Sequence, residues 1–423
     1  MELSSSVLIM ALVLLTVVCG ELQLVGSVDF STHLTHSKAK ANVSITLLLD
    51  AVEKGAVCLD GSPPSYYLDR GVGSGSNKWV IDIEGGGWCN NRKTCRLRAK
   101  TRRGSSTVLP KEKTFSGILS SVQSENPDFY NWNRVKVSYC DGSSFTGDVK
   151  EVNQTTGYVY FRGQRIWQAV MEDLLAKGMC EAEEALLTGC SAGGLTTILH
   201  CDEFRALLPM NTKVKCLSDA GFFLNIEDVS GRNYIRDFFH QTVTLHGSAK
   251  NLDPTCTSTM NPALCFFPQY ILKSIKTPLF ILNSAYDYWQ VTTSLVSKGS
   301  DPNHEWDLCK KKISDCDAEQ LDKLQDFRNL MLRAAEEIRR SKEGGLFIDS
   351  CYVHCQTGLQ NLWHAENSPK LGSKSLAGAV ADWYFDRNVS KHIDCPYPCH
   401  TKCDQTLQKR VLSDFTYSFM DQI

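Results

Sequence analysis

The sequence predicts an α/β fold in which helices cover both faces of a mostly parallel sheet. Short apolar runs alternate along the chain with segments of helical periodicity, which is the pattern of strands joined by helical crossovers. Several of the apolar runs contain few polar residues, as expected of strands that are buried on both faces. The 18 cysteines in 423 residues further predict that disulfides staple this fold.

The same patterns place the elements in chain order. Apolar runs predict strands at residues 79–83, 135–139, 185–188, 214–217, 278–282 and 345–348. Helical spacing of apolar residues predicts helices at residues 165–177, 195–205 and 322–340. No internal repeat or long linker interrupts this alternation, so a single domain over residues 46–423 is the simplest organisation.

The predicted strand at residues 185–188 leads into the motif Gly-Cys-Ser-Ala-Gly, and a predicted helix follows. Strand, Gly-x-Ser-x-Gly and helix in this order are typical of the nucleophile elbow of an α/β-hydrolase. Gly189 and Gly193 leave room for the sharp turn, and the serine between them needs a base to take its proton. We therefore predict an α/β-hydrolase-like catalytic domain with Ser191 as its nucleophile.

In that fold the acid and then the histidine follow the serine in the chain, each in a loop after a later strand. Asp287 follows the apolar strand at residues 278–282, and His354 follows the last predicted strand. We predict them as acid and base. Asp219, after the strand at residues 214–217, is the competing acid, and the fallback bases are His304 and His364.

A serine esterase also needs hydrogen-bond donors for the negative charge that develops on the attacked carbonyl oxygen. The loop Glu84-Gly85-Gly86-Gly87-Trp88-Cys89 directly follows a predicted strand. Its glycines let the backbone turn amides toward a substrate, so we predict the N–H groups of Gly87, Trp88 and Ala192 as the oxyanion hole. A phosphate-binding loop would need a following lysine and Ser or Thr, which this segment lacks.

The N-terminus predicts secretion. Residues 1–20 have the apolar core and small terminal residues of a signal peptide, and about a dozen apolar residues are too few to span a membrane. Residues 419–423 carry neither an ER-retention signal nor a hydrophobic tail for a lipid anchor. We expect a secreted protein with an N-terminal arm at residues 21–45 and no stable membrane anchor. The net charge of −2 gives no reason to expect nucleic acid as a partner.

Secretion agrees with the cysteine content, because disulfides persist in oxidising compartments. Removal of Cys19 with the signal peptide leaves seventeen of the 18 cysteines, so at least one is unpaired. We expect this to be Cys190, because a crosslink beside the nucleophile would block the turn. Local disulfides are plausible within the close pairs Cys89 and Cys95, Cys256 and Cys265, and Cys309 and Cys316.

The cysteines near the C-terminus predict disulfides and not a metal site, and three asparagines predict N-glycosylation. Cys395, Cys399, His400 and Cys403 have a zinc-like spacing, but in a secreted chain disulfides are favoured, and we predict no metal and no cofactor. Acceptor sequons for N-glycans begin at Asn42, Asn153 and Asn388.

In its motifs the chain resembles the plant pectin acetylesterases, relatives of the secreted animal hydrolase Notum. The likeness covers nearly the whole mature chain and rests on Leu59-Asp60-Gly61-Ser62-Pro63-Pro64, Gly85-Gly86-Gly87-Trp88-Cys89, Gly189-Cys190-Ser191-Ala192-Gly193-Gly194, Asp219-Ala220-Gly221-Phe222-Phe223, Asn283-Ser284-Ala285-Tyr286-Asp287 and His354-Cys355-Gln356. The resemblance implies the same nucleophile, acid and base as the residues themselves. It also implies the substrate, acetyl esters on cell-wall pectin, from which an acyl-enzyme would release acetate in the cell wall or apoplast.

Two other functions remain open from the sequence. A Notum-like carboxylesterase would remove a longer acyl group from a protein, and a non-catalytic protein of this kind would only bind carbohydrate. Residues 91–103 hold seven basic residues and no acidic one. Pectin carries uronate carboxylates that arginine can bind in bidentate fashion, so we expect Arg98, Arg102 and Arg103 to contact the polymer. We expect a monomer.

Overall fold

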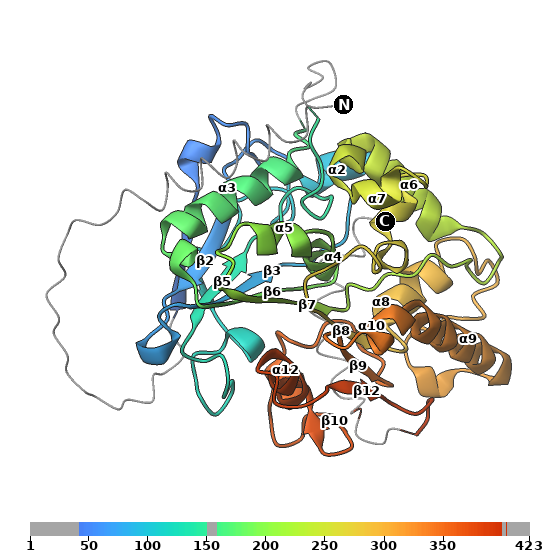
Figure 1. The fold of residues 1–423 in the computed structure, drawn as a ribbon. Coiled ribbons are helices and arrows are strands. Elements are labelled where there is room, and N and C mark those ends of the chain that lie inside the picture. The colour runs from blue at the N-terminus through green and yellow to red at the C-terminus, as the bar shows by residue number, and fades with distance from the viewer. Residues whose placement is uncertain (1–41, 150–158, 400–402, 404–423) are drawn as a thin grey trace, which may run out of the picture.

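The structure is a computed structural model that describes residues 42–149, 159–399 and 403 (Figure 1). The predicted signal peptide, the sequon at Asn153, His400 and residues 21–41 of the predicted arm lie outside the described residues. The arm was predicted to reach residue 45, whereas the first strand of the sheet already begins at Asn42.

One sheet of ten strands organises the described part of the chain, in the order β12, β9, β8, β7, β6, β3, β5, β2, β1, β4. The strands from β12 to β5 pair in parallel, and β2, β1 and β4 add antiparallel strands at one edge. The bounds are β1 Asn42–Leu47, β2 Ser65–Asp69, β3 Lys78–Ile83, β4 Glu112–Thr114, β5 Asn133–Val137, β6 Glu184–Cys190, β7 Lys213–Asp219, β8 Leu279–Ser284, β9 Gly345–Asp349 and β12 Lys391–Ile393. The predicted fold class is confirmed.

Helices pack on both faces of this sheet, as Figure 1 shows with α3 and α12 on opposite sides. Alternate residues of β3 explain the two layers: Ile81 and Ile83 belong to the large core beneath α3, α4, α6 and α9, and Val80 belongs to the core beneath α12. The bounds are α2 Arg92–Arg98, α3 Gly163–Ala176, α4 Ala192–Leu199, α5 Cys201–Ala206, α6 Tyr234–His246, α7 Pro254–Thr257, α8 Tyr288–Gln290, α9 Ala318–Ala334, α10 Glu336–Arg340, α11 Gln360–Trp363 and α12 Leu376–Tyr384.

Two predicted helices are each divided in the structure. The helix expected at residues 195–205 is α4 and α5, which meet at His200, and the helix expected at residues 322–340 is α9 and α10, which meet at Ala335. A two-stranded ribbon of β10 Lys370–Leu371 and β11 Lys374–Ser375 precedes α12. Among the described residues, none of the helices combines the length and apolar character needed to cross a membrane.

Disulfides close eight loops within the described residues. The three predicted local pairs are confirmed: Cys89 with Cys95, Cys256 with Cys265, and Cys309 with Cys316. The cysteines with zinc-like spacing are also in disulfides, Cys395 with Cys399 and Cys403 with Cys351. A disulfide sulfur has no thiolate to offer a metal ion, so the preference for disulfides over zinc at these cysteines is correct.

Candidate active site

Ser191 lies on a tight turn between β6 and α4. Its backbone φ of 59° and ψ of −124° are costly for a residue with a side chain, and such strain is typical of functional turns. The turn closes only because its neighbours are glycines: a Cβ on Gly193 would lie 2.2 Å from the carbonyl oxygen of Ile83, and one on Gly189 would lie 2.5 Å from that of Gly193. This geometry is that of a nucleophile elbow.

Asp287 and His354 form a buried pair beyond the carboxyl ends of β8 and β9. The His354 Nδ1 atom lies 2.8 Å from Oδ2 and 3.0 Å from Oδ1 of Asp287. Asp287 Oδ1 also accepts the backbone N–H of Gln290 at 2.9 Å, so the carboxylate caps α8 while it orients the imidazole. An ionised carboxylate on Nδ1 holds the tautomer that leaves Nε2 able to accept a proton.

A disulfide joins the two loops that carry Ser191 and His354. It links Cys190, directly before the serine, to Cys355, directly after the histidine, with a Cα–Cα distance of 5.6 Å. The expectation that Cys190 is a free thiol is therefore wrong. The crosslink does not block the turn, since Ser191 keeps its elbow conformation, and it ties the elbow to the histidine loop.

Asp219, the competing acid, binds these same loops and not the imidazole. Its Oδ2 atom accepts hydrogen bonds of 2.7 Å from the backbone N–H groups of Gln356 and Thr357 and from the Thr357 hydroxyl. Its carbonyl oxygen accepts the N–H of Ser191 at 2.9 Å. Burial raises the pKa of Asp219 to about 6, although the hydrogen bonds oppose this shift. Asp219 thus fixes the serine and histidine loops relative to each other.

A second buried carboxylate, Asp349 at the end of β9, was not singled out from the sequence. Its Oδ2 atom accepts the side-chain N–H of Gln356 at 2.7 Å, and its Oδ1 atom accepts the backbone N–H of Cys351 at 3.0 Å. Burial raises the pKa of Asp349 to about 7. Gln356, two residues after His354, is therefore held through its backbone by Asp219 and through its side chain by Asp349.

The fallback histidines lie in other surroundings. His304 is exposed and has its Nδ1 atom 3.2 Å from Oδ2 of Asp307, in a surface loop. His364 is half-buried directly after the short helix α11. Among the described residues, the structure pairs His354 with Asp287 and gives neither fallback histidine that partner.

The glycine-rich loop after β3 passes directly beside Ser191. A Cβ on Gly85 would lie 2.8 Å from the serine Cβ, so any larger residue there would collide with the elbow. Within the described residues, the N–H groups of Gly87, Trp88 and Ala192 donate no hydrogen bond, whereas the next amide, that of Cys89, bonds to Gly142. Three backbone donors near the serine are therefore available for a ligand.

Side-chain hydrogen bonds hold this loop in place. The Tyr139 hydroxyl donates to the carbonyl oxygen of Gly87 at 2.8 Å. The Trp88 indole N–H donates to the Ser144 hydroxyl, which in turn donates to the carbonyl oxygen of Ala192, each at 2.8 Å. The chain of bonds connects the loop to the first turn of α4 and so fixes the three N–H groups relative to Ser191.

The basic segment beside this loop differs from the prediction at Arg98. Its side chain is 3% exposed, and its guanidinium donates to the carbonyl oxygens of Gly86 at 2.7 Å and Arg103 at 2.9 Å. Burial lowers its pKa. Arg98 therefore supports the glycine-rich loop from inside and is not placed to contact a polymer. The burial of Arg98 could not be predicted from the sequence, because apolar and basic residues alternate in this segment without a clear helical face.

Arg103 and Arg102 differ from each other in exposure. The Arg103 side chain is 16% exposed and lies 3.4 Å from the carboxylate of Glu84. Burial acts to raise the pKa of Glu84, but the Lys113 and Arg103 cations outweigh it and lower the pKa to about 2. Arg103 is thus occupied by an internal ion pair, and Arg102 is the only one of the three predicted contact residues that is exposed.

Aromatic side chains fill the space beside His354. The Trp289 ring is stacked 6.1 Å from the imidazole, and the Trp88 ring lies 5.7 Å from Trp289 and 4.9 Å from Phe223. Edge-to-face packing continues from Trp88 to Phe239 at 4.9 Å. The wall next to His354 is therefore aromatic and densely packed.

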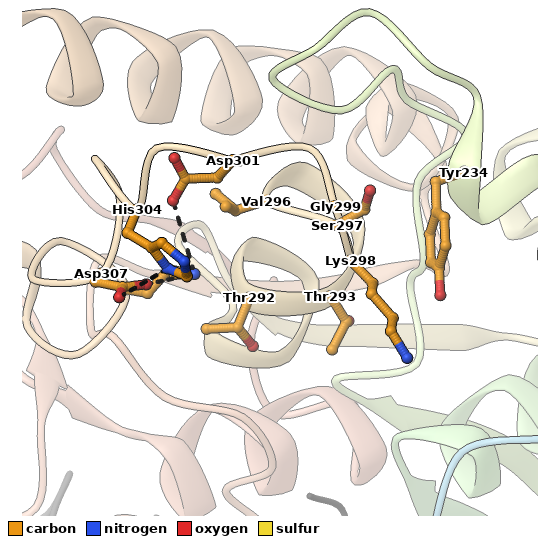
Figure 2. Close-up of a pocket in the computed structure, with 11 residues that line it drawn as sticks. Tyr234, Thr292, Thr293, Val296, Ser297, Lys298, Gly299, Asp301, His304 and Asp307 are labelled. Carbon is orange, nitrogen blue, oxygen red and sulfur yellow. Dashed lines mark ion pairs between the residues drawn. The ribbon is translucent and has the colours of Figure 1, made fainter. Parts of the chain in front are cut away.

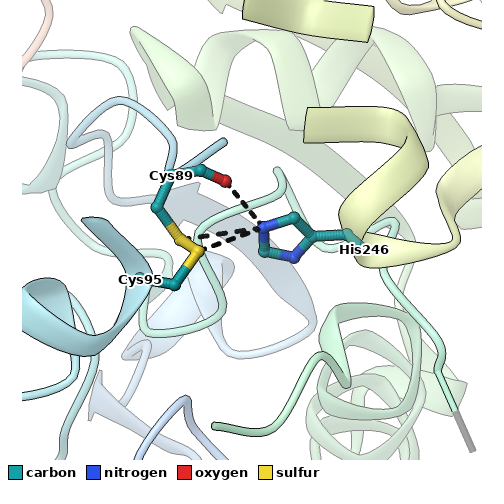
Figure 3. Close-up of side chains that lie close together, drawn as sticks. All are labelled: Cys89, Cys95 and His246. Atoms are coloured by element: carbon teal, nitrogen blue, oxygen red, sulfur yellow. Dashed lines mark hydrogen bonds between the residues drawn. A yellow bond between two sulfur atoms is a disulfide. The ribbon is translucent and has the colours of Figure 1, made fainter. Parts of the chain in front are cut away.

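A cysteine and histidine cluster behind the glycine-rich loop has the composition of a metal site but not its chemistry (Figure 3). Cys89 and Cys95 form a disulfide, and His246 Nε2 lies 2.9 Å from the carbonyl oxygen of Cys89. Burial lowers the pKa of His246 to about 4, so the ring is neutral and donates this hydrogen bond. The cluster anchors the loop to the end of α6.

Comparisons with known proteins place the chain among esterases. A family model described as Pectinacetylesterase matches residues 36–404. Pectin acetylesterases 7 and 11 of Arabidopsis thaliana are 50% and 49% identical over 362 residues, which cover 85% of this chain and 92% of each relative. Palmitoleoyl-protein carboxylesterase notum1' of Xenopus laevis is 33% identical over 271 residues, which cover 60% of this chain and 54% of that protein.

The solved structure of the Wnt deacylase Notum from Drosophila has the same fold. It superposes with a TM-score of 0.72 at 23% identity, and the match covers 86% of this chain and 100% of that one. At this level of identity the similarity concerns the arrangement of the sheet and helices.

Proposed function

Because this chain belongs to the pectinacetylesterase family and is a carboxylic ester hydrolase, we propose that it removes acetyl groups from pectin through Ser191, His354 and Asp287. The observation that carries this proposal is the buried pair of Asp287 and His354. The loop of His354 is crosslinked by a disulfide to the elbow that carries Ser191. A non-catalytic carbohydrate-binding protein would have no use for a strained serine turn with an oriented imidazole beside it.

In the proposed reaction the Ser191 hydroxyl attacks the acetyl carbonyl carbon while His354 Nε2 takes the hydroxyl proton. Asp287 holds the imidazole through Nδ1 and stabilises the imidazolium that forms. The N–H groups of Gly87, Trp88 and Ala192 donate to the oxyanion. His354 then gives its proton to the sugar oxygen as the C–O bond breaks. Water, deprotonated in turn by His354, hydrolyses the acetyl-serine and releases acetate.

The packed aromatic wall favours a short acyl group. Trp88, Phe223 and Trp289 contact one another at ring distances of 4.9 to 5.7 Å next to His354, and we expect these rings to limit the room for an acyl chain. The alternative of a lipid-removing esterase rests on the 33% identical palmitoleoyl-protein carboxylesterase relative, and such an acyl group needs an extended apolar cavity.

Activity on a series of aryl esters separates these alternatives. We expect kcat/KM to fall steeply beyond about four acyl carbons, because each methylene that meets the wall costs roughly 1–3 kcal/mol. Initial rates on para-nitrophenyl esters from acetate to decanoate measure this. A kcat/KM that keeps rising to eight or more carbons would favour the lipid esterase.

The exposed basic surface around Arg102 is proposed to attract the uronates of the polymer, while Arg98 acts through the loop. Arg98→Gln should lower kcat on an aryl acetate and on acetylated pectin alike, because it removes the charge-assisted bond to Gly86. Arg102→Gln should raise only the KM for pectin, and 0.5 M salt should abolish the difference from wild type because the screening length falls to about 4 Å at that ionic strength. Equal effects of Arg102→Gln on both substrates would exclude this role.

We further propose that the protein is secreted to the cell wall as a monomeric glycoprotein. The disulfides of the described residues fit an oxidising compartment, and the proposed catalytic residues come from one chain. The sequon residues Asn42 and Asn388 are both exposed, as glycosylation requires. Because β1 belongs to the same sheet as the catalytic strands, we place the start of the catalytic domain at or before Asn42 instead of residue 46.

A further inference from the structure

A groove of about 380 Å³, a size typical of small-molecule sites, lies in the segment that follows Asp287 in the chain (Figure 2). It is formed by the first residue of α6, Tyr234, and by the segment 292–310, which follows the helical turn that begins at Asp287. Most of its lining residues have polar side chains, and neither the proposed triad nor the oxyanion loop contributes to it.

The groove has an uncompensated positive charge at one end. Its two carboxylates are already paired, since Lys310 Nζ lies 3.1 Å from Asp307 and 3.9 Å from Asp301, and His304 Nδ1 lies 3.2 Å from Asp307. Lys298 is exposed and forms no ion pair with any described residue. Figure 2 shows the ion pairs gathered at one end of the groove and Lys298 with Tyr234 at the other.

The backbone that carries Lys298 is fixed. The Arg232 guanidinium donates to the Lys298 carbonyl oxygen and to the Ser297 hydroxyl, each at 3.0 Å. The Ser297 hydroxyl in turn donates to the buried carboxylate of Asp228 at 2.5 Å. The lysine side chain therefore projects from a rigid base, which lowers the entropic cost of binding a ligand there.

Two groove residues are hydrogen-bonded to the helical turn that carries Trp289. Thr292 and Thr293 donate their hydroxyl protons to the carbonyl oxygens of Tyr288 and Trp289, and the Trp289 ring is stacked on His354. The helical segment from Asp287 to Thr293 begins as α8 and continues as a π-helical turn over Val291–Leu295, so Thr293 lies less than about 9 Å along the axis from Asp287. The oxygen atoms of both threonines keep lone pairs that can accept hydrogen bonds from sugar hydroxyls.

We propose that this groove is a galacturonate-binding subsite, in which Lys298 binds the carboxylate and the Tyr234 ring contacts the sugar face. The inference rests on the proposed function, because it assumes that a galacturonan occupies the active site. It assigns the groove the recognition of unesterified uronate, a feature that a lipid or protein substrate would not supply.

Calorimetric titration of the full-length protein with a non-acetylated oligogalacturonate tests the subsite. Lys298→Gln should raise the dissociation constant roughly three- to tenfold, as expected for one partly exposed charge-assisted contact. The matched control is Lys342→Gln. Lys342 is an exposed lysine just before the amino end of β9, whereas the proposed active site lies beyond the carboxyl ends of the strands, so this change should leave binding unchanged. Both variants should hydrolyse an aryl acetate as wild type does.

Two further ligands and variants identify the contacts. The effect of Lys298→Gln should vanish with the methyl-esterified oligomer, which has no free carboxylate. Tyr234→Ala should weaken binding of both oligomers, whereas Tyr234→Phe should retain it. If wild type binds the oligogalacturonate and Lys298→Gln binds equally well, the subsite is overturned and the proposed function stands. If wild type hydrolyses aryl acetates but binds no oligogalacturonate, the galacturonan substrate itself is overturned, together with the subsite.

Discussion

Ser191→Ala should lower kcat on an aryl acetate by about 10⁴-fold or more. Without the hydroxyl no acyl-enzyme can form, and only the oxyanion donors and substrate binding remain to accelerate hydrolysis. The change removes one oxygen from a side chain that is 3% exposed, so the fold should persist. Turnover of para-nitrophenyl acetate by the purified variant measures the loss, with thermal unfolding to verify the fold.

The matched control for this variant is Ser218→Ala, the same change at a buried serine on the neighbouring strand β7. The Ser218 hydroxyl donates to the carbonyl oxygen of Gly194 at 3.0 Å, and its loss should cost about 1 kcal/mol of stability. It should leave kcat within a few-fold of wild type, because Ser218 has no part in the proposed chemistry. A folded Ser191→Ala protein that retained more than about one hundredth of wild-type turnover would remove Ser191 from the mechanism.

Asp287→Asn should lower kcat by about 10⁴-fold with little effect on stability. The asparagine amide would donate to His354 Nδ1, which places the remaining proton on Nε2 and prevents that atom from accepting the serine proton. The amide oxygen can still accept the N–H of Gln290 and cap α8. Rates on para-nitrophenyl acetate across the pH range separate loss of the base from a simple shift of its pKa.

Asp219→Asn is the informative comparison, because the residue is equally buried but contacts the loops and not the ring. The asparagine oxygen can still accept one or two of the three bonds that Gln356 and Thr357 donate to Asp219. We expect a loss of roughly tenfold to a hundredfold, well below that of Asp287→Asn. The reverse ranking would assign the acid to Asp219.

The parts of the fold with a local sequence signal could be predicted. The central parallel strands are continuous apolar runs, and the elbow combines a strand, two glycines and a helix within a short segment. The fold supplies the chain order of acid and base, and the ends of the predicted strands then indicate Asp287 and His354 as the candidates. The antiparallel strands β1 and β2 and the three-residue edge strands β4 and β12 were missed, because polar residues interrupt them and their pairing depends on distant partners.

The supporting residues of the site depend on tertiary contacts that spacing does not reveal. Cys190 and Cys355 are 165 residues apart in the sequence. They meet only because Cys190 ends β6 and Cys355 lies in the loop after β9, and the carboxyl ends of these parallel strands lie on the same side of the sheet. Arg98 belongs to a run of exposed basic residues in the sequence, yet folding buries it beneath Gly86. The sequence offers Asp219 as a competing acid, and its contacts to Gln356 and Thr357 form only once the histidine loop is folded.

The most direct test of the account is acetate release from an acetylated, unmethylated galacturonan, measured by an enzymatic acetate assay. Wild-type protein should release acetate until most acetyl groups are gone, and the Ser191→Ala variant should release no more than buffer alone. A pure, folded wild-type protein that hydrolyses para-nitrophenyl acetate but leaves the acetyl content of the polymer unchanged would contradict the proposed substrate.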